Sequence, residues 1–363
     1  MARLRQDPFT WQWVITGETS PASPSAGPAP PTPEARLRPP AGGAGEQASG
    51  PADPAATGTE ALRGAGCPFC PAQQAAARES VLSERPAGAD WRVRVIADRA
   101  PLLRVEGDLD RTAEGLFDSM NAVGAHEIII EGQEHAATPA SLPHELWCSL
   151  LEVFRDRISD RKRDPRFRYV EVFQNHGPLA GALVSHPHAQ LIAAPVLPHR
   201  VERELRAAAH HYHLKQRCLY CDLIRQETHT PQRVVADQDG FLLLCPYASR
   251  FPYEMWLLPR RHHASFEAAT AGADVRAALA GVLQTALRKA ERVAASFHFF
   301  LHTEPSRRLP PVLAERWRTL SEDYHWHIEI LPRLEARRKY LHEEEFYLNP
   351  VLPEEAARTL RQL

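Results

Sequence analysis

The sequence predicts an α+β fold made of two tandem copies of one module, each a mainly antiparallel sheet with one long helix. The first observation is a repeated motif: in each half a Cys-x-x-Cys pair precedes a His-x-His pair by a similar length of chain. These pairs lie at residues 67–70 and 186–188, and at residues 218–221 and 325–327. The second observation is that strand-like segments flank one long helical segment in each half, whereas a doubly wound parallel sheet would alternate strands and helices.

Strand-like segments of the first half combine β-branched or aromatic residues with alternating polarity. They lie at residues 9–15, 91–96, 126–131, 168–173 and 186–190. Apolar side chains recur at helical spacing over residues 143–161, which predicts one long helix. In a strand over residues 186–190, side chains two apart share a face, so His186, His188 and Gln190 are expected to point the same way.

The second half repeats this order after a charged connecting helix expected over residues 200–217. Predicted strands lie at residues 240–245, 254–258, 297–301 and 326–331, and a predicted helix spans residues 273–296. We therefore expect one domain at residues 1–199 and another at residues 200–363. Residues 18–66 are rich in Pro, Ala, Gly and Ser and hold few large apolar side chains, so we expect a disordered insertion there.

The composition argues against several classes of function. The net charge of −2 gives no electrostatic case for binding nucleic acid or a membrane surface. No apolar run reaches membrane-spanning length, and the first residues lack the apolar core of a signal peptide. Four of the six cysteines form two close pairs, which without an export signal favours zinc thiolates over disulfides and a cytoplasmic protein.

Short motifs along nearly the whole chain outside residues 18–66 form a coherent set. They are Arg5-Gln-Asp-Pro8, Trp13-Val-Ile15, Gly66-Cys-Pro-Phe-Cys70, Gly115-Leu-Phe117, Gly124-Ala-His-Glu-Ile-Ile-Ile-Glu131, Phe173-Gln-Asn-His-Gly-Pro-Leu-Ala-Gly181, Ser185-His-Pro-His-Ala-Gln-Leu-Ile192, Phe251-Pro-Tyr-Glu254, Tyr324-His-Trp-His-Ile-Glu-Ile-Leu-Pro332 and Tyr347-Leu-Asn-Pro-Val-Leu-Pro-Glu-Glu355. With them the chain resembles galactose-1-phosphate uridylyltransferases and the related sugar-nucleotide phosphorylases, the transferase branch of the histidine-triad superfamily. The resemblance implies tandem histidine-triad-like domains, a homodimer, and a nucleotide sugar and a sugar 1-phosphate as substrates.

The resemblance assigns His188 as the nucleophile. A neutral imidazole is a good nucleophile near pH 7, so His188 would attack the α-phosphate of a nucleotide sugar and form a nucleotidyl-histidine. A second phosphate acceptor would then take the nucleotidyl group, in ping-pong order. Gln190 can donate to phosphoryl oxygens but cannot act as a base toward water, which favours transfer over hydrolysis. In the second half Glu329 follows His327 at that spacing and would repel a phosphate, so this half is expected to be non-catalytic.

Three further residues are expected to contact the substrate. Relatives place an Asn at the position of Asn175, where it holds the phosphate or orients the nucleophile. Gly181 lies in the turn before the histidine strand, where backbone N–H groups can face phosphate oxygens. Asp98 stands where relatives have an Asn that contacts the nucleoside, and Leu183 stands where they often have a Ser. Because an ionised carboxylate only accepts hydrogen bonds, Asp98 bears on which nucleotide is used.

A structural zinc site is implied for the first half. Its expected ligands are Cys67, Cys70, His135 and His186. A Cys₂His₂ set is typical of a closed structural zinc site. His135 is chosen because it lies where the family's third ligand lies, and His126 is the alternative.

A second zinc site is implied for the other half. Its expected ligands are Cys218, Cys221, His262 and His325. Spacing from Pro259 in relatives favours His262 over His263. Other members bind a metal through one Glu and three His, and Glu204, His302, His325 and His327 occupy those positions. Because thiolate suits zinc we favour the Cys₂His₂ set and two zinc ions per chain, with iron as the alternative ion at this second site.

Three functions therefore remain in competition. The first is uridylyl exchange between UDP-glucose and galactose 1-phosphate. The second is phosphorolysis of ADP-glucose, with inorganic phosphate as the acceptor. The third is a non-catalytic zinc protein, against which the combination of Asn175, His188 and Gln190 argues.

Overall fold

The computed structural model describes residues 3–16, 66–75, 81–308, 315, 317–334 and 347–363. The expected insertion at residues 18–66 lies outside this part of the chain apart from Gly66. The elements of the first half are β1 (Arg3–Gln6), β2 (Trp13–Thr16), α1 (Pro71–Ala75), β3 (Val81–Arg85), β4 (Val93–Ala97), β5 (Thr112–Glu114), β6 (Phe117–Ser119), β7 (Ala125–Glu131), α2 (His144–Arg161), β8 (Tyr169–His176), η3 (Pro178–Ala180) and β9 (His188–Ala194). Those of the second half are α3 (His199–Lys215), α4 (Leu219–His229), β10 (Val234–Gln238), β11 (Phe241–Leu244), β12 (Met255–Pro259), α5 (Phe266–Ala269), α6 (Ala273–Val293), β13 (Phe297–His302), α8 (Leu320–Asp323), β14 (His327–Pro332), β15 (Tyr347–Asn349) and α9 (Pro353–Gln362).

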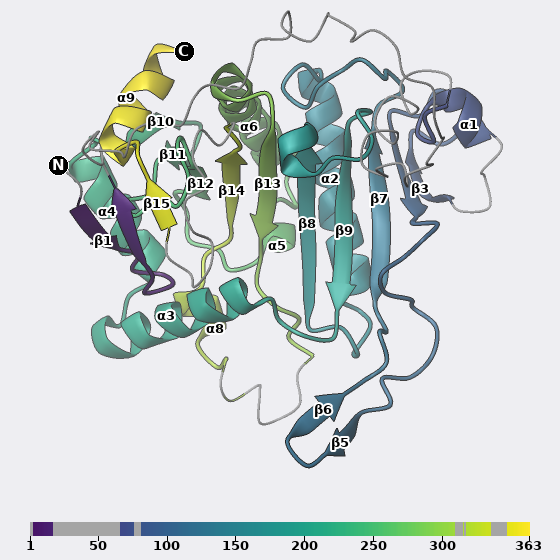
Figure 1. The fold of residues 1–363 in the computed structure, drawn as a ribbon, viewed down its shortest axis with the longest axis horizontal. Helices are drawn as coiled ribbons and strands as arrows, with labels where there is room; N and C mark the ends of the chain where they lie inside the picture. Colours follow the sequence, from purple (N-terminus) through teal and green to yellow (C-terminus); the bar gives the residue numbers. More distant parts are fainter. Residues whose placement is uncertain (1–2, 17–65, 76–80, 309–314, 316, 335–346) are drawn as a thin grey trace, which may run out of the picture.

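One ten-stranded sheet dominates the fold, in the order β10-β11-β12-β14-β13-β8-β9-β7-β4-β3 (Figure 1). All neighbouring strands in it are antiparallel. The first half contributes β3-β4-β7-β9-β8 and the second β10-β11-β12-β14-β13, so both halves have the same strand order and meet at β8 and β13. The predicted α+β class is confirmed, and the shared order is the arrangement that an internal duplication requires.

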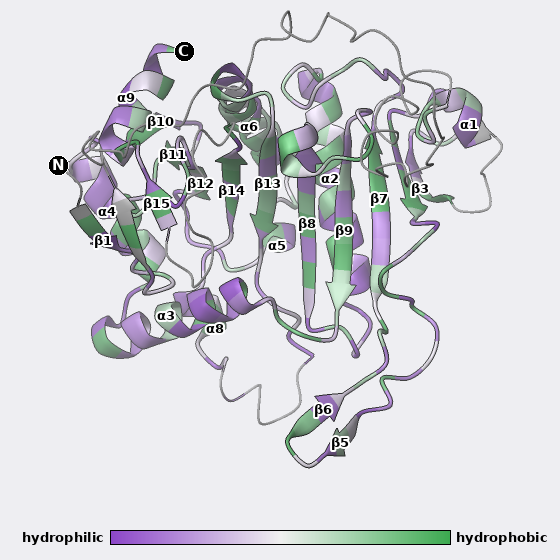
Figure 2. Ribbon diagram, viewed as in Figure 1, coloured by the Kyte–Doolittle hydropathy of each residue, from purple (hydrophilic) through white to green (hydrophobic). Residues whose placement is uncertain are grey.

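The two long helices cover one face of this sheet, which we call the back face. α2 and α6 contribute Trp147, Phe154, Leu283 and Leu287 to a core in which all four side chains are fully buried. Burying a large apolar side chain stabilises a fold by roughly 1.5–3 kcal/mol, so this layer contributes strongly to stability. Figure 2 shows how hydropathy follows this layering: β13 in the sheet is mainly hydrophobic, whereas the peripheral α3 is mainly hydrophilic.

The opposite, front face is covered unequally in the two halves. In the second half, α3 and α4 pack on it and bury Leu205, Tyr220 and Trp256. In the first half, among the residues that the structure describes, a smaller cluster that includes Phe69 and Ile130 lies on the same face. The front face of the first half therefore has room for a cavity.

The predicted strand at residues 9–15 is wrong in its first part. The chain instead forms a hairpin in which β1 pairs with β2, and β15 joins β2 as a third strand. Asp7 shapes the turn, because its carboxylate accepts hydrogen bonds from the Phe9 N–H (2.9 Å) and from the Thr10 hydroxyl (2.7 Å). Such local bonds of an Asp side chain favour a turn over a strand.

The strand predicted at residues 186–190 begins two residues later in the structure. β9 starts at His188, whose direct partner is Ile130 on β7. Pro187 has no N–H to donate to a sheet, and the ring of His186 contacts Cys70 outside the strand. His188 and Gln190 share a face of β9, whereas His186 belongs to the preceding loop.

Candidate active site and metal-binding groups

A cavity of about 440 Å³ opens on the front face of the first half. The residues predicted to act on the substrate all line it: Asp98, Asn175, Gly181, His188 and Gln190. They come from the end of β4, from β8, from the turn after η3 and from β9. The structure thus brings together five residues that are spread over almost a hundred positions of the sequence.

His188 lies at the floor of this cavity with one ring nitrogen committed. Its Nδ1 is 2.8 Å from the carbonyl oxygen of His186. A carbonyl only accepts, so Nδ1 donates and Nε2 keeps its lone pair. Burial lowers the pKa of the His188 imidazole, which favours the neutral ring, and the Phe69 ring packs against it at 4.8 Å. This is the protonation state that a nitrogen nucleophile requires.

The two amides of the cavity each contact a histidine. Gln190 Oε1 lies 3.0 Å from Nε2 of His126 on β7. Asn175 Oδ1 lies 2.8 Å from Nδ1 of His298 on β13. An amide oxygen accepts and a ring N–H donates, so the NH₂ group of each amide is the end left for a ligand.

Asp98 and Gly181 line the cavity with most of their polar groups already engaged. Asp98 Oδ1 accepts from the Ala100 N–H at 3.0 Å, and its Oδ2 lies 3.0 Å from Nδ1 of His126. Gly181 has a φ of 74°, a conformation that favours glycine, but its N–H donates to the carbonyl of Pro178 at 3.0 Å. The Gly181 N–H is therefore engaged within the turn, and a contact between backbone N–H groups of this turn and a phosphate stays a prediction.

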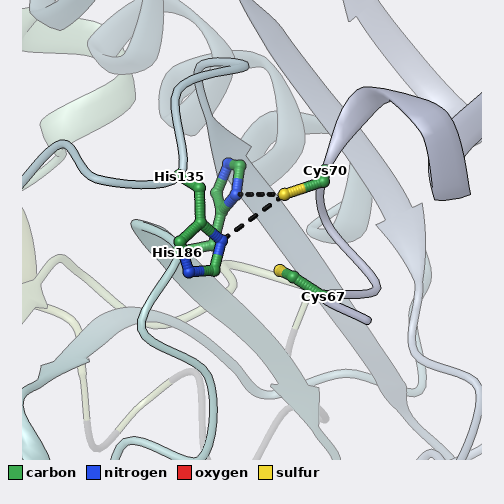
Figure 3. A group of neighbouring side chains, drawn as sticks. All are labelled: Cys67, Cys70, His135 and His186. Carbon is green, nitrogen blue, oxygen red and sulfur yellow. Dashed lines mark hydrogen bonds between the residues drawn. The ribbon is translucent and has the colours of Figure 1, made fainter. Parts of the chain in front are cut away.

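The ligands expected for the first metal site form one group: Cys67, Cys70, His135 and His186. Figure 3 shows their side chains converging from the first Cys pair, the segment after β7 and the loop before β9. Cys70 Sγ lies 3.4 Å from Nδ1 of His135 and 3.7 Å from Nδ1 of His186. Tetrahedral zinc with bonds of about 2.3 Å to sulfur and about 2.0 Å to nitrogen separates two such ligands by about 3.5 Å.

The outer hydrogen bonds of these histidines also suit a metal. His186 Nε2 lies 3.0 Å from the Gly132 carbonyl, and His135 Nε2 lies 3.1 Å from the Ser185 hydroxyl. A carbonyl partner places the ring proton of His186 on Nε2 and frees Nδ1 as a ligand atom, the usual arrangement around bound zinc. His126 is not in this group, so the structure favours His135 as the third residue.

The ligands expected for the second site form a matching group: Cys218, Cys221, His262 and His325. Cys221 Sγ lies 3.4 Å from Nδ1 of His262 and 3.8 Å from Nδ1 of His325. Both histidines donate through Nε2 to backbone carbonyls, at 2.8 Å each. The donor atoms thus repeat those of the first group, with a backbone carbonyl in place of the Ser185 hydroxyl as one outer partner, and both groups fit zinc.

The alternative ligand set of one Glu and three His does not form a single group in the structure. His325 lies with the cysteines, whereas Glu204, His302, His327 and Glu329 form a separate, fully buried cluster. Arg200 pairs with Glu204 and Glu329, and Arg250 pairs with Glu329 at 2.7 Å. Burial alone would raise the pKa of Glu329, but these two arginines hold it well below its ordinary value. The arginines already supply the positive charge that a metal would bring, so we assign no metal to this cluster.

Sequence reasoning missed two histidines of the front face. The sequence predicts a place for His126 on a strand and names it as the alternative metal ligand, but it gives His298 no role. The alternation of side chains along a strand could have identified His126. It lies two residues before Ile128, the direct partner of Gln190, and therefore on the same face of the sheet as Gln190. His298 has no such signal, because its pairing with Asn175 joins the two halves and depends on the whole sheet.

Comparison with known proteins gives consistent matches. A family model described as galactose-1-phosphate uridyl transferase, N-terminal domain, matches residues 2–198. ADP-glucose phosphorylase of Arabidopsis thaliana is 25% identical over 302 residues, 82% of each chain. Galactose-1-phosphate uridylyltransferase of Thermotoga maritima is 28% identical over 255 residues, 69% of this chain and 77% of the relative.

Solved structures agree on the fold. The crystal structure of an ADP-glucose phosphorylase from Arabidopsis thaliana with bound ADP-glucose matches with a TM-score of 0.75 at 24% identity, covering 100% of this chain and 99% of that one. A structure described as uridylyltransferase matches with a TM-score of 0.68 at 22% identity, covering 100% and 98%. Within the part of the chain that the structure describes, no helix combines the length and apolarity needed to cross a bilayer.

Proposed function

The chain belongs to the galactose-1-phosphate uridyl transferase family, and from this membership we propose that it transfers a nucleotidyl group from a nucleotide sugar to a phosphate acceptor through His188. The observation that carries the proposal is the cavity in which His188, Gln190 and Asn175 meet. The His188 imidazole keeps its Nε2 lone pair, since Nδ1 donates to a carbonyl, and it shares the cavity with two amides that can donate to phosphoryl oxygens.

In the first half-reaction, Nε2 of His188 attacks the α-phosphorus of the nucleotide sugar. A bond forms between Nε2 and phosphorus, and the bond from phosphorus to the bridging oxygen breaks. The electron pair stays on that oxygen, which leaves as part of the sugar 1-phosphate. The Nδ1 proton stays on the ring, where the carbonyl of His186 stabilises the positive charge that the ring acquires.

In the second half-reaction, a phosphate oxygen of the acceptor attacks the same phosphorus. The bond to Nε2 breaks, and its electron pair returns to the ring. The acceptor is already an anion, so no base is needed. Water does need one, and Gln190 cannot provide it, which makes transfer faster than hydrolysis.

The second half of the chain is proposed to be non-catalytic. By the shared strand order, His327 on β14 corresponds to His188 on β9, and Tyr220 packs on His327 as Phe69 packs on His188. His327 is fully buried, and the neighbouring Glu329 pairs with Arg200 and Arg250. Protein side chains therefore fill the space that a nucleotide would need.

The donor and acceptor define two candidate activities. The resemblance in the motifs favours UDP-glucose as the uridylyl donor and galactose 1-phosphate as the acceptor. Similarity to ADP-glucose phosphorylase over 82% of both chains favours ADP-glucose and inorganic phosphate instead. Asp98, in place of the usual Asn, lies in the cavity and bears on this choice.

We further propose that Cys67, Cys70, His135 and His186, and likewise Cys218, Cys221, His262 and His325, bind one zinc ion each. Zinc here would cross-link the loops before and after the strands, without entering the chemistry. The first ion would fix His186, whose carbonyl holds His188. A homodimer and a cytoplasmic location remain predictions of the resemblance and the composition.

Product analysis with two substrate pairs tests the proposal. UDP-glucose with galactose 1-phosphate should yield UDP-galactose, or ADP-glucose with phosphate should yield ADP, and His188→Ala should yield neither. Whichever pair turns over identifies the activity. No turnover with either pair by folded, zinc-loaded protein would contradict both candidate activities.

A further inference from the structure

The amide of Gln190 contacts the side chain of His126, which in turn contacts the side chain of Asp98. Its Oε1 lies 3.0 Å from Nε2 of His126. On the other side of the ring, Nδ1 of His126 lies 3.0 Å from Oδ2 of Asp98. The second oxygen of Asp98 accepts from the Ala100 N–H, which fixes the carboxylate in turn.

Three adjacent strands build this chain. Asp98 directly follows β4, His126 lies on β7 and Gln190 lies on β9. Ile128 is the direct partner of Gln190, so His126, two residues earlier, lies on the same face and diagonal to it. The Asp98 N–H also donates to the His126 carbonyl at 3.1 Å, which locks the backbones of the two residues together. With only 9% of its surface exposed, His126 has little freedom to move.

The chemistry of Gln190 determines the direction of its contact with His126. An amide oxygen only accepts hydrogen bonds, so Nε2 of His126 donates to Oε1 of Gln190. The carboxylate of Asp98 lies against the other side of the ring, 3.0 Å from Nδ1, and limits how far the ring can turn.

This arrangement decides which end of the Gln190 amide faces the cavity. An unconstrained amide can rotate and exchange its oxygen with its NH₂ group. The oxygen would repel the phosphoryl oxygens, whereas the NH₂ group donates to them. With the oxygen held by His126, the NH₂ group is the end that remains for the phosphoryl group on His188.

We propose that His126, held against Asp98, is a positioning residue that fixes the orientation of the Gln190 amide and thereby sets the ratio of transfer to hydrolysis. This inference rests on the proposed function, since it requires a nucleotidyl-His188. His126 would touch neither substrate nor zinc, and its effect would pass through Gln190.

The test is the partition of the nucleotidyl-enzyme between acceptor and water. The intermediate is formed with UDP-glucose or ADP-glucose, freed of excess donor, and chased with galactose 1-phosphate or phosphate. His126→Leu has a similar volume but no donor, and we expect the ratio of transfer to hydrolysis to fall roughly 10-fold, the upper range for a lost neutral hydrogen bond. His126→Gln supplies an amide NH₂ in place of the ring N–H, and should keep the ratio within about 3-fold of wild type.

Two further variants separate this role from a structural one. Asp98→Asn leaves His126 in place beside a neutral amide, and should lower the ratio less than His126→Leu does. His298→Ala removes the histidine of the other amide, Asn175, and should slow formation of the intermediate without changing its partition.

The outcomes distinguish the two proposals. A wild-type intermediate with an unchanged ratio in His126→Leu and Asp98→Asn would overturn the positioning role alone. An equal fall in His126→Leu and His126→Gln would also overturn it, because the lost feature would then be the ring and not the donor. If wild-type protein forms no intermediate with either donor, the proposed function fails and this inference fails with it.

Discussion

Asn175 on β8 and His298 on β13 are direct partners across the junction of the two halves of the sheet. Asn175 Oδ1 accepts a hydrogen bond of 2.8 Å from Nδ1 of His298. Burial, together with the charge of Arg333, lowers the pKa of His298 to about 4, so the ring is neutral at pH 7 and has one N–H to donate. The second half thus contributes to the cavity of the first half by orienting one of its amides.

This relationship predicts that His298→Ala slows formation of the nucleotidyl-enzyme. Loss of one neutral hydrogen bond typically costs about 0.5–1.5 kcal/mol, which corresponds to about a 2- to 12-fold lower rate. Single-turnover kinetics with the accepted nucleotide sugar measure that rate. His298→Asn, which retains an N–H donor, is the matched control, and a wild-type rate in His298→Ala would show that the pairing does not matter.

Gln190→His should raise hydrolysis of the intermediate relative to transfer. An imidazole at this position can take a proton from water, which the amide cannot do. Product ratios at fixed acceptor concentration measure the partition, with Gln190→Asn as a control that shortens the side chain but adds no base. An identical partition in Gln190→His and wild type would mean that the amide does not protect the intermediate.

Metal analysis should give two zinc equivalents per chain. Cys70→Ser and Cys221→Ser each remove a thiolate from one group, and each should lower the content to one equivalent. Cys148→Ser changes a cysteine outside both groups and should retain two. One equivalent or none in the wild-type protein would refute the pair of sites.

Glu131→Gln should stabilise the protein at alkaline pH. Burial raises the pKa of Glu131 from 4.5 to about 8, so the folded protein retains a proton that the unfolded chain releases. The folded state binds more protons between these values, and the stability of the wild type therefore falls as the pH rises through this window. The variant should escape this loss, which reaches on the order of 5 kcal/mol above pH 8.

Denaturant unfolding at pH 5 and at pH 8.5 measures this difference. Glu127 on the same face of β7 is a contrasting control, because it is equally buried but pairs with Arg157 and Arg161. Glu127→Gln should destabilise the protein at both pH values. A pH dependence of Glu131→Gln equal to that of wild type would mean that Glu131 is not protonated in the folded state.

Much of the fold followed from local patterns in the sequence. Helix α2 and strands β7 and β8 lie within a few residues of their predicted bounds, because their apolar spacing matches one period throughout. The start of β9 was misplaced, since the apparent strand at residues 186–190 contains Pro187, which cannot donate to its neighbour. Strand β15 was not predicted, because its partner β2 lies at the other end of the chain.

The candidate site was predicted largely from the resemblance of its motifs to a known family. The residues of both expected Cys₂His₂ groups lie together, and the five residues expected to bind or act on substrate line one cavity. The contacts that orient them were not predictable. One of these contacts is the pairing of Asn175 with His298, and another is the set of ion pairs beside His327. Both depend on strands that only the complete sheet brings together.

The most direct measurement is intact mass after incubation with UDP-glucose and, separately, with ADP-glucose, followed by mapping of the modified residue. A covalent adduct on His188, of uridylyl mass with the first donor or adenylyl mass with the second, is the predicted result, with no adduct in His188→Ala. A folded, zinc-loaded protein that forms no adduct with either donor, or forms one that persists in His188→Ala, would contradict nucleotidyl transfer through this histidine.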